Sequence, residues 1–347
     1  MRPVRVCVYG GTDLKGAPPG FVSALSYEIL DSMEAVIVTG GFLHSNESPG
    51  AKSTDSAALD GARLYAEKRG KNLRDCFEAW IPEPTLDLRP DVRGAVRMSE
   101  GDGVTVRVMS GRTPLGRRLA MVAGVDIVIT ISGRQHTEVV VEQALELGVP
   151  VLPIPDAGGD SERLLGRYRA RIAASYDEGA LDHCLAEVSR TIAADPTAAA
   201  KAVVQLVRTA KVGKCLVLLP YDPEHEALWS SSIRRAVEQH MVAVRLDHLP
   251  KSDAIYSSFS EAMRTSSAVI ADITEINENV MYEVGYAHGR GLALLIYTMD
   301  AARLDRLPVY FRTLNVRLVS NEMPLEKLID DYLLSVKDTR RLRQPTA

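Results

Sequence analysis

The chain has 347 residues, 46% of them hydrophobic and 25% charged, with a formal net charge of −4. This length and apolar content suffice for two globular domains, each with its own hydrophobic core. The slightly acidic balance and an aromatic content of only 5% argue against nucleic acid and anionic membrane surfaces as partners.

The cysteines and the apolar runs argue against a zinc protein, a disulfide-rich protein and a membrane-spanning protein. The four cysteines contain no CxxC pair, so neither a zinc site nor a disulfide framework is predicted, and we expect no metal ion or resident cofactor. The first residues read as a β-strand rather than as a signal peptide, and no apolar run reaches the roughly 18 residues needed to span a bilayer. A cytoplasmic protein without a membrane partner is therefore expected.

Three apolar, β-branched runs in the first part of the chain each stop at glycine or at a Ser-Gly pair. They cover residues 4–9, 35–39 and 126–131. Short buried runs of this kind, alternating with helices, indicate a parallel sheet with both faces covered. Ligands of such sheets bind at the carboxyl ends of the strands, so the glycine turns are predicted to line one crevice. The glycines concerned are Gly10, Gly11, Gly40, Gly41 and Gly133.

The sequence after the third run is mainly helical. Residues 137–147 have a clear helical pattern that closes at a glycine, and residues 151–154 add one more short strand. From about residue 161 to 210 the chain is rich in alanine, leucine and arginine and has little strand character. We therefore predict a ligand-binding α/β domain over residues 1–165, followed by a helical connector over residues 166–212.

A second α/β pattern begins at Lys214. Its apolar runs stop at polar or turn residues, and helical segments separate them. The predicted strands are residues 215–219, 242–246, 268–272 and 293–297, and the predicted helices are residues 229–239, 255–265 and 280–288. Residues 213–347 are thus predicted as a second domain. The predicted fold class is α/β, with two doubly wound parallel-sheet domains joined by helices.

The most informative position of the second domain is Glu283. The preceding strand ends at Asp272, and Asn279 is a predicted N-cap for a helix that is almost wholly apolar apart from Glu283. A carboxylate in the first turns of such a helix gains from the helix dipole and lies near the crevice at the strand ends. The same spacing also fits a glutamate that faces solvent or caps its own helix.

Residues 268–298 closely resemble the nucleoside 2-deoxyribosyltransferase-like and TIR-like superfamily. The typical sequence motif of that superfamily is a strand ending in Ala-Asp-Leu/Ile-Thr, followed by Asn-x-Asn-Val-x-Tyr-Glu-Leu/Val-Gly-x-Ala-His. The strand and turn at residues 218–222 also match, and the similarity extends over about residues 214–321. The matching positions in the motif are Ala271, Asp272, Thr274, Asn277, Asn279, Val280, Tyr282, Glu283, Gly285, Ala287 and His288.

This resemblance implies chemistry at the anomeric carbon of a ribosyl group. In the transferases the matching glutamate is the nucleophile, and in the TIR enzymes it stabilises the ribosyl cation as nicotinamide leaves NAD. The resemblance implies Glu283 as the catalytic carboxylate, with Asp272 and Asn277 holding the ribose hydroxyls. The residues implied in substrate binding are Tyr221, Asp222, Asn279 and Tyr282. The transferases add a second acid near the base, for which Asp253 and Glu278 are the candidates.

The first domain is similar to the SLOG superfamily, which includes lysine-decarboxylase-like phosphoribohydrolases and ligand-sensing domains of bacterial defence proteins. The similarity rests on the glycine turns and on residues 132–138 and 150–155. The enzymes of that superfamily carry a Pro-Gly-Gly-x-Gly-Thr-x-x-Glu loop that cradles a phosphate. Here Arg134 and His136 replace two of the glycines, and Val140 occupies the position of the glutamate. Hydrolysis by this domain is therefore not expected.

Binding of an anion by the first domain is still predicted. Backbone N–H groups at the start of the helix near Thr137 and Glu138 favour an anion, and Arg134 adds a bidentate donor. Arg117 and Arg118 fall in the first turn of a helix that follows a Thr-Pro pair. Basic residues there oppose the helix dipole, which makes sense if a phosphorylated ligand lies nearby. The same arginines also fit a solvated surface.

The two resemblances together imply a defence-type effector. A nucleotide-derived signal bound by the SLOG-like domain would control cleavage of the N-glycosidic bond of NAD or a related nucleotide by the TIR-like domain, with NAD as substrate rather than cofactor. By analogy, the protein would act as a homo-oligomer. Two alternatives stay open: a metabolic nucleoside or nucleotide N-glycosidase or deoxyribosyltransferase, and a nucleotide sensor without catalysis.

Overall fold

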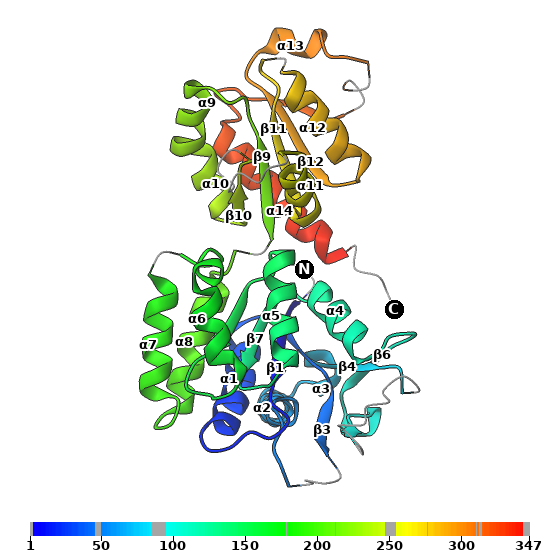
Figure 1. Ribbon diagram of the computed structural model, residues 1–347, viewed down its shortest axis with the longest axis vertical. Helices are drawn as coiled ribbons and strands as arrows, with labels where there is room; N and C mark the ends of the chain where they lie inside the picture. The colour runs from blue at the N-terminus through cyan, green and yellow to red at the C-terminus, as the bar shows by residue number, and fades with distance from the viewer. Residues whose placement is uncertain are drawn as a thin grey trace. The chain divides into compact units, whose positions relative to one another are not determined.

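The chain folds into two compact α/β units. The computed structural model describes residues 3–342 except 46–49, 85–94, 178, 212, 247–254, 276, 310 and 312–313. Unit 1 extends to Ala210 and unit 2 begins at Lys211. Each unit has a parallel sheet flanked by helices, so the predicted fold class is confirmed (Figure 1).

Unit 1 is built on a six-stranded sheet in which all neighbouring strands are parallel. The strand order is β6-β4-β2-β1-β7-β8, so the order reverses between β1 and β7. Such a reversal is the switch point at which doubly wound sheets bind their ligands. The strands are β1 (Val4–Gly10), β2 (Ala35–Thr39), β4 (Phe77–Pro82), β6 (Thr105–Met109), β7 (Ile127–Ile131) and β8 (Val151–Ile154).

Two of these strands, β4 and β6, were not predicted from the sequence. Every residue of β2 and β7 is buried, which gives the continuous apolar runs that identify inner parallel strands. In contrast, β4 carries Glu78 and the edge strand β6 carries Arg107, which interrupt the apolar pattern. The two side chains form an ion pair with 2.9 Å between Arg107 Nε and Glu78 Oε2. The two charges that interrupt the apolar pattern of these strands, and so prevent their prediction from sequence, therefore compensate each other in the fold.

Helices of unit 1 pack in two groups, with α1 against α2 and α8, and with α5 against α4 and α6. An antiparallel ribbon of β3 (Phe42–Ser45) and β5 (Ala95–Arg97) lies outside the main sheet. The helices are α1 (Pro18–Ser32), α2 (Thr54–Arg69), α3 (Leu73–Cys76), α4 (Pro114–Gly124), α5 (His136–Leu147), α6 (Asp160–Ala173), α7 (Ala180–Thr191) and α8 (Pro196–Arg208).

The helices over residues 166–212, predicted as a connector, belong largely to unit 1. The buried side chains of α7 and α8, such as Leu185 and Val203, join the same hydrophobic core as the strands of unit 1. Helix α8 packs against α1, the first helix of the chain. The apolar faces of these helices therefore complete the core of unit 1, and only the residues after Ala210 lead into unit 2.

Unit 2 has a five-stranded parallel sheet of order β10-β9-β11-β12-β13. The order reverses between β9 and β11, which places the switch point of this unit there. The predicted strand at residues 242–246 is shorter in the structure and ends at Val244. The strands are β9 (Lys214–Leu218), β10 (Val242–Val244), β11 (Ala268–Asp272), β12 (Ala293–Thr298) and β13 (Val316–Leu318).

Successive strand residues of unit 2 enter two separate cores, as expected for a sheet covered on both faces. In β9, Val217 packs in the core that contains Trp229 and Ile329, whereas Leu218 packs in the core that contains Met263 and Val284. The helices are α9 (Pro223–Leu228), a π-helical turn (Trp229–Ile233), α10 (Arg234–Glu238), α11 (Ile255–Thr265), α12 (Glu278–Gly289), α13 (Ala301–Asp305) and α14 (Leu325–Leu342). No helix in the described part of the chain combines the length and apolarity needed to cross a membrane.

Candidate functional site

Unit 1 has a pocket of about 1010 Å³ at the carboxyl ends of β1, β2 and β7. The strand ends that the sequence predicts as glycine turns thus open into one space at the switch point of the sheet. Helix α7 also contributes, through Ser189 near its end. Residues from the sequence prediction that line the pocket are Gly10, Gly11, Gly40, Arg117, Arg118, Gly133, Arg134 and Thr137.

Two predicted signal-binding residues lie outside this lining. Gly41 packs closely against Ile81 of β4, since a Cβ at Gly41 would come within 2.7 Å of the Ile81 side chain. The Glu138 carboxylate instead pairs with two arginines of α6, at 3.0 Å from Arg163 Nη2 and 2.5 Å from Arg167 Nη1. Hydrogen bonding to Arg163 lowers the pKa of Glu138. Its charge is therefore compensated on the surface and is not offered to the pocket.

The turn between β7 and α5 holds an uncommon backbone conformation. Ser132 and Gln135 have φ angles of 56° and 47°, and Asp156 on the facing turn has 56°. Non-glycine residues with positive φ are uncommon and cluster at functional sites. Gly133 has a φ of 88°, and a Cβ there would lie 1.9 Å from Thr137 Oγ1. Only glycine therefore fits at position 133, and all of these residues line the pocket.

Two buried arginines from α4 reach the other side of the pocket. Arg117 and Arg118 are 3% and 5% exposed, so the alternative of a solvated surface is wrong. Arg118 Nε donates a hydrogen bond of 2.8 Å to the hydroxyl of Tyr9 at the end of β1. Arg117 lies against Gly40, where a Cβ would be only 2.5 Å from its Nη1 atom. Burial lowers the pKa of Arg117.

Asp55, on α2, is a pocket residue that the sequence does not reveal. It is 6% exposed, and its Oδ2 atom accepts a hydrogen bond of 2.8 Å from the backbone N–H of Phe42. Burial raises the pKa of this carboxyl group. Arg97 of β5 also lines the pocket and donates to the carbonyl of Gly40 at 3.2 Å. Neither residue follows a glycine turn, so only the folded chain brings them to the site.

In unit 2 the candidate acid Glu283 lies on α12, which packs against β9 and β11, the strands of the switch point. Its side chain is partly buried, and burial raises its pKa to about 7. Among the described residues, no hydrogen bond or ion pair involves its carboxylate. The structure therefore excludes a capping role and leaves a carboxyl group whose charge no described neighbour compensates.

The N-cap of α12 is Asn277, not Asn279. The Oδ1 atom of Asn277 accepts hydrogen bonds from the backbone N–H groups of Asn279 at 3.0 Å and Val280 at 3.3 Å. Asn279 is exposed in the first turn, as is Glu278. The two asparagines are two residues apart, a difference within the usual uncertainty of helix ends. The other candidate second acid, Asp253, lies outside the described residues.

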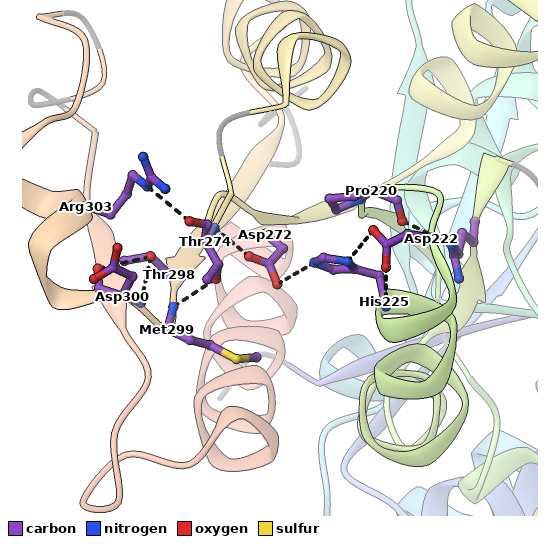
Figure 2. A network of polar contacts seen from close by, with 10 residues as sticks. Pro220, Asp222, His225, Asp272, Thr274, Thr298, Met299, Asp300 and Arg303 are labelled. Atoms are coloured by element: carbon purple, nitrogen blue, oxygen red, sulfur yellow. Dashed lines mark hydrogen bonds and ion pairs between the residues drawn. The ribbon is translucent and has the colours of Figure 1, made fainter.

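A histidine that the sequence prediction overlooked joins the two aspartates at this switch point. Figure 2 shows His225 between Asp222, which follows β9, and Asp272, the last residue of β11. His225 Nδ1 is 2.7 Å from Asp222 Oδ2, and its Nε2 is 3.9 Å from Asp272 Oδ2. Asp222 also caps α9, since its Oδ1 accepts the backbone N–H of His225 at 2.9 Å. The sequence pattern Asp-Pro-x-His is typical of a capped helix start, and this pattern could have identified His225 as a residue near the site.

Asp272 is the most buried acid of this cluster, at 1% exposure. Its Oδ1 accepts a hydrogen bond of 2.7 Å from the backbone N–H of Thr274 (Figure 2). Burial and the Asp272 charge raise the pKa of Tyr297 on β12. Tyr221 and Tyr282, the two predicted substrate-binding tyrosines, are 57% and 58% exposed. Among the described residues no group of three or more His, Cys, Asp and Glu side chains could hold a metal ion.

Comparison with known proteins gives only distant similarities. No protein-family model matches the chain, and no curated protein matches it. Among solved structures, the structural-genomics target TM1055 shares 15% identity at a TM-score of 0.34, over 47% of this chain and 81% of its own.

Two further structures are similar to the same degree. DNA processing protein A from Helicobacter pylori shares 16% identity at a TM-score of 0.33, covering 49% of this chain and 74% of that one. The molybdenum cofactor binding protein from Rippkaea orientalis shares 17% identity at a TM-score of 0.33, covering 49% and 86%. Similarity at this level supports no conclusion about activity, ligand or partner.

Proposed function

We propose that unit 2 is an enzyme that cleaves the N-glycosidic bond of a nucleotide, with Glu283 as the catalytic carboxylate. A nucleotide-derived signal bound in the pocket of unit 1 controls it. NAD is the leading candidate substrate. The observation that carries the proposal is Glu283 itself: a partly buried carboxyl group with a pKa of about 7 and no described partner, beside the switch point of a parallel sheet.

The electrostatics of Glu283 favour a substrate that brings positive charge. Burial disfavours the ionised carboxylate in the free protein, and a nearby cation reverses this preference. Departure of a base from ribose develops an oxocarbenium-like charge at the anomeric carbon, and the nicotinamide ring of NAD is already cationic. An ionised Glu283 beside that carbon would therefore stabilise the transition state more than the bound substrate, in which the positive charge lies on the nicotinamide ring.

The aspartates and His225 supply a second part of the argument. Asp272 lies at the end of β11 with one oxygen bound to a backbone amide and the other facing His225. A carboxylate held in this way suits binding of a diol such as ribose. The side-chain oxygen of Asn277 is used by the helix cap, so its contribution to a ribose would come from its amide nitrogen.

A second candidate reaction is favoured by the same pKa. A carboxyl group that is half protonated near neutral pH suits a general acid that protonates a neutral leaving base, as in a nucleoside glycosidase. The two readings differ in their pH dependence. Cleavage of NAD should rise with pH as Glu283 ionises, whereas general-acid cleavage of a neutral nucleoside should fall.

The test uses the pure full-length protein with NAD and a panel of nucleosides and nucleotides, with and without candidate signals. We expect Glu283→Gln to lower turnover by about a hundredfold or more, as for loss of one preorganised electrostatic group. The matched control is Glu261→Gln, since Glu261 is exposed and pairs with Arg264 on α11. If Glu283→Gln retains full activity, the assignment is wrong. The defence role and the homo-oligomer stay predictions from the family resemblance.

A further inference from the structure

The pocket of unit 1 contains a buried arginine that forms no ion pair with any of the described residues. Arg117 lines the pocket at 3% exposure, and within the described chain its Nε atom has no hydrogen-bond partner. Its Nη1 atom donates one weak hydrogen bond, to Met121 Sδ at 3.9 Å. No carboxylate of the described residues lies within ion-pair distance. A guanidinium taken out of water without a partner is strongly unfavourable, which points to an anion that is bound there.

The surroundings of Arg117 form a built site. Gly40 leaves the space for its guanidinium, and Arg118, held by Tyr9, adds a second buried cation. A Cβ at Gly40 would also lie 3.2 Å from Asp55 Oδ2, so the buried carboxyl group of Asp55 lies near the guanidinium of Arg117 without forming an ion pair with it. Among the described residues that line the pocket, five are basic and three are acidic: Lys15, Arg97, Arg117, Arg118 and Arg134 against Asp13, Asp55 and Asp156.

The turn before α5 is the competing position for an anion. Arg134 there is exposed to solvent, so its charge is not buried and does not require a ligand. The amide groups at the start of α5 are available, but the start of a helix alone gives only a modest preference for negative charge. Of these two positions, the one at Gly40 holds the cation that is buried without an ion pair to a described residue.

We propose that the terminal phosphate of the unit 1 ligand binds at Arg117 and Arg118 beside Gly40, and not at the turn that precedes α5. The ligand class is a nucleotide with a free phosphate monoester, since such a group carries about −1.5 to −2 charges at neutral pH and accepts several hydrogen bonds. The nucleoside part occupies the rest of the pocket, toward the strained turn at Gly133. This inference rests on nucleotide binding by unit 1 but not on the reaction proposed for unit 2.

The experiment measures binding of three probes to the full-length protein by titration calorimetry and thermal shift. The probes are inorganic phosphate, adenosine 5′-monophosphate and adenosine, with sodium chloride at matched ionic strength as control. We expect phosphate and the monophosphate to raise the melting temperature of the wild type, and adenosine to bind at least tenfold more weakly than the monophosphate. Arg117→Met should weaken binding of the monophosphate by about tenfold to a hundredfold. Arg134→Ala should change it by less than about threefold.

Stability without ligand separates a binding role from a structural role. Because Arg117→Met removes a buried charge that forms no ion pair with a described residue and keeps most of the side-chain volume, the ligand-free melting temperature should be unchanged or higher. A lower ligand-free melting temperature for Arg117→Met would show a structural arginine and overturn the proposal. Loss of binding in Arg134→Ala with retention in Arg117→Met would also overturn it. If the wild type binds neither phosphate nor the monophosphate, the proposal fails, whereas cleavage of NAD by unit 2 is decided by its own assay.

Discussion

Replacing Glu283 by glutamine should stabilise unit 2 at alkaline pH, although it should lower the proposed activity. Burial raises the pKa of Glu283 from 4.5 to about 7. Between these values the unfolded chain loses the proton and the folded chain keeps it, so the free energy of unfolding falls as pH rises through this window. Above about pH 7 the penalty is complete, and below about pH 4.5 it disappears.

The size of the effect follows from the same shift. At about 1.4 kcal/mol per pKa unit, the shift corresponds to at most about 3.5 kcal/mol. The side chain is only partly buried, and solvent screening reduces the figure, so we expect about 1–2 kcal/mol. For a unit of this size that is an increase in melting temperature of roughly 3–10 °C for Glu283→Gln at pH 8. At pH 4.5 or below the variant and the wild type should unfold alike.

The assay can follow unit 2 separately. The sequence has two tryptophans, and Trp229 is buried in unit 2, so its fluorescence in a Trp80→Phe background reports the unfolding of that unit. Glu261→Gln is the control with the opposite sign, because hydrogen bonding to Arg264 lowers the pKa of Glu261. A melting temperature for Glu283→Gln that falls at pH 8, or a difference that does not change between pH 4.5 and pH 8, would refute the reasoning.

Three further predictions concern the described contacts. Asn277→Ala should lower the free energy of unfolding of unit 2 by about 1 kcal/mol by removing the cap of α12, whereas Asn279→Ala should cost only a few tenths, by urea denaturation. Gly133→Ala should cost unit 1 at least about 2 kcal/mol, because a positive φ and a steric clash coincide, and Gly158→Ala, where a Cβ meets nothing within 4 Å, about 1 kcal/mol. His225→Gln should lower nucleotide cleavage roughly tenfold in steady-state kinetics without unfolding unit 2; unchanged kinetics would remove His225 from the site.

The sequence predicts those features of the fold that depend on a short segment of the chain, and not those that depend on neighbours distant in sequence. Strands such as β2 and β11 are buried on both faces and stop at glycine or aspartate, so composition alone identifies them and their carboxyl ends. The glycine turns of unit 1 follow from the same pattern. Strand β6 lies at an edge and carries a charge that is compensated only by its neighbour, which local sequence does not contain.

The residues missed at the two sites share one cause. His225 was missed because it becomes a neighbour of Asp272, which the sequence does single out, only through the adjacency of β9 and β11, although another strand lies between them in sequence. Asp55 reaches its pocket through the packing of α2, not through a strand end. Strand order depends on how whole helices and strands pack, so a local motif does not predict which polar residues will be neighbours in the fold.

The two units have a common design with opposite charge. Each has a partly or fully buried ionisable group near a switch point, Arg117 in unit 1 and Glu283 in unit 2, which forms no ion pair with a described residue. Burying such a group makes the empty unit less stable, and a ligand of opposite charge recovers that loss on binding. An anionic group therefore suits unit 1 and a cationic centre suits unit 2. Because the two requirements differ in sign, the same chemical group cannot satisfy both sites, which favours distinct roles for the two units over a duplicated one.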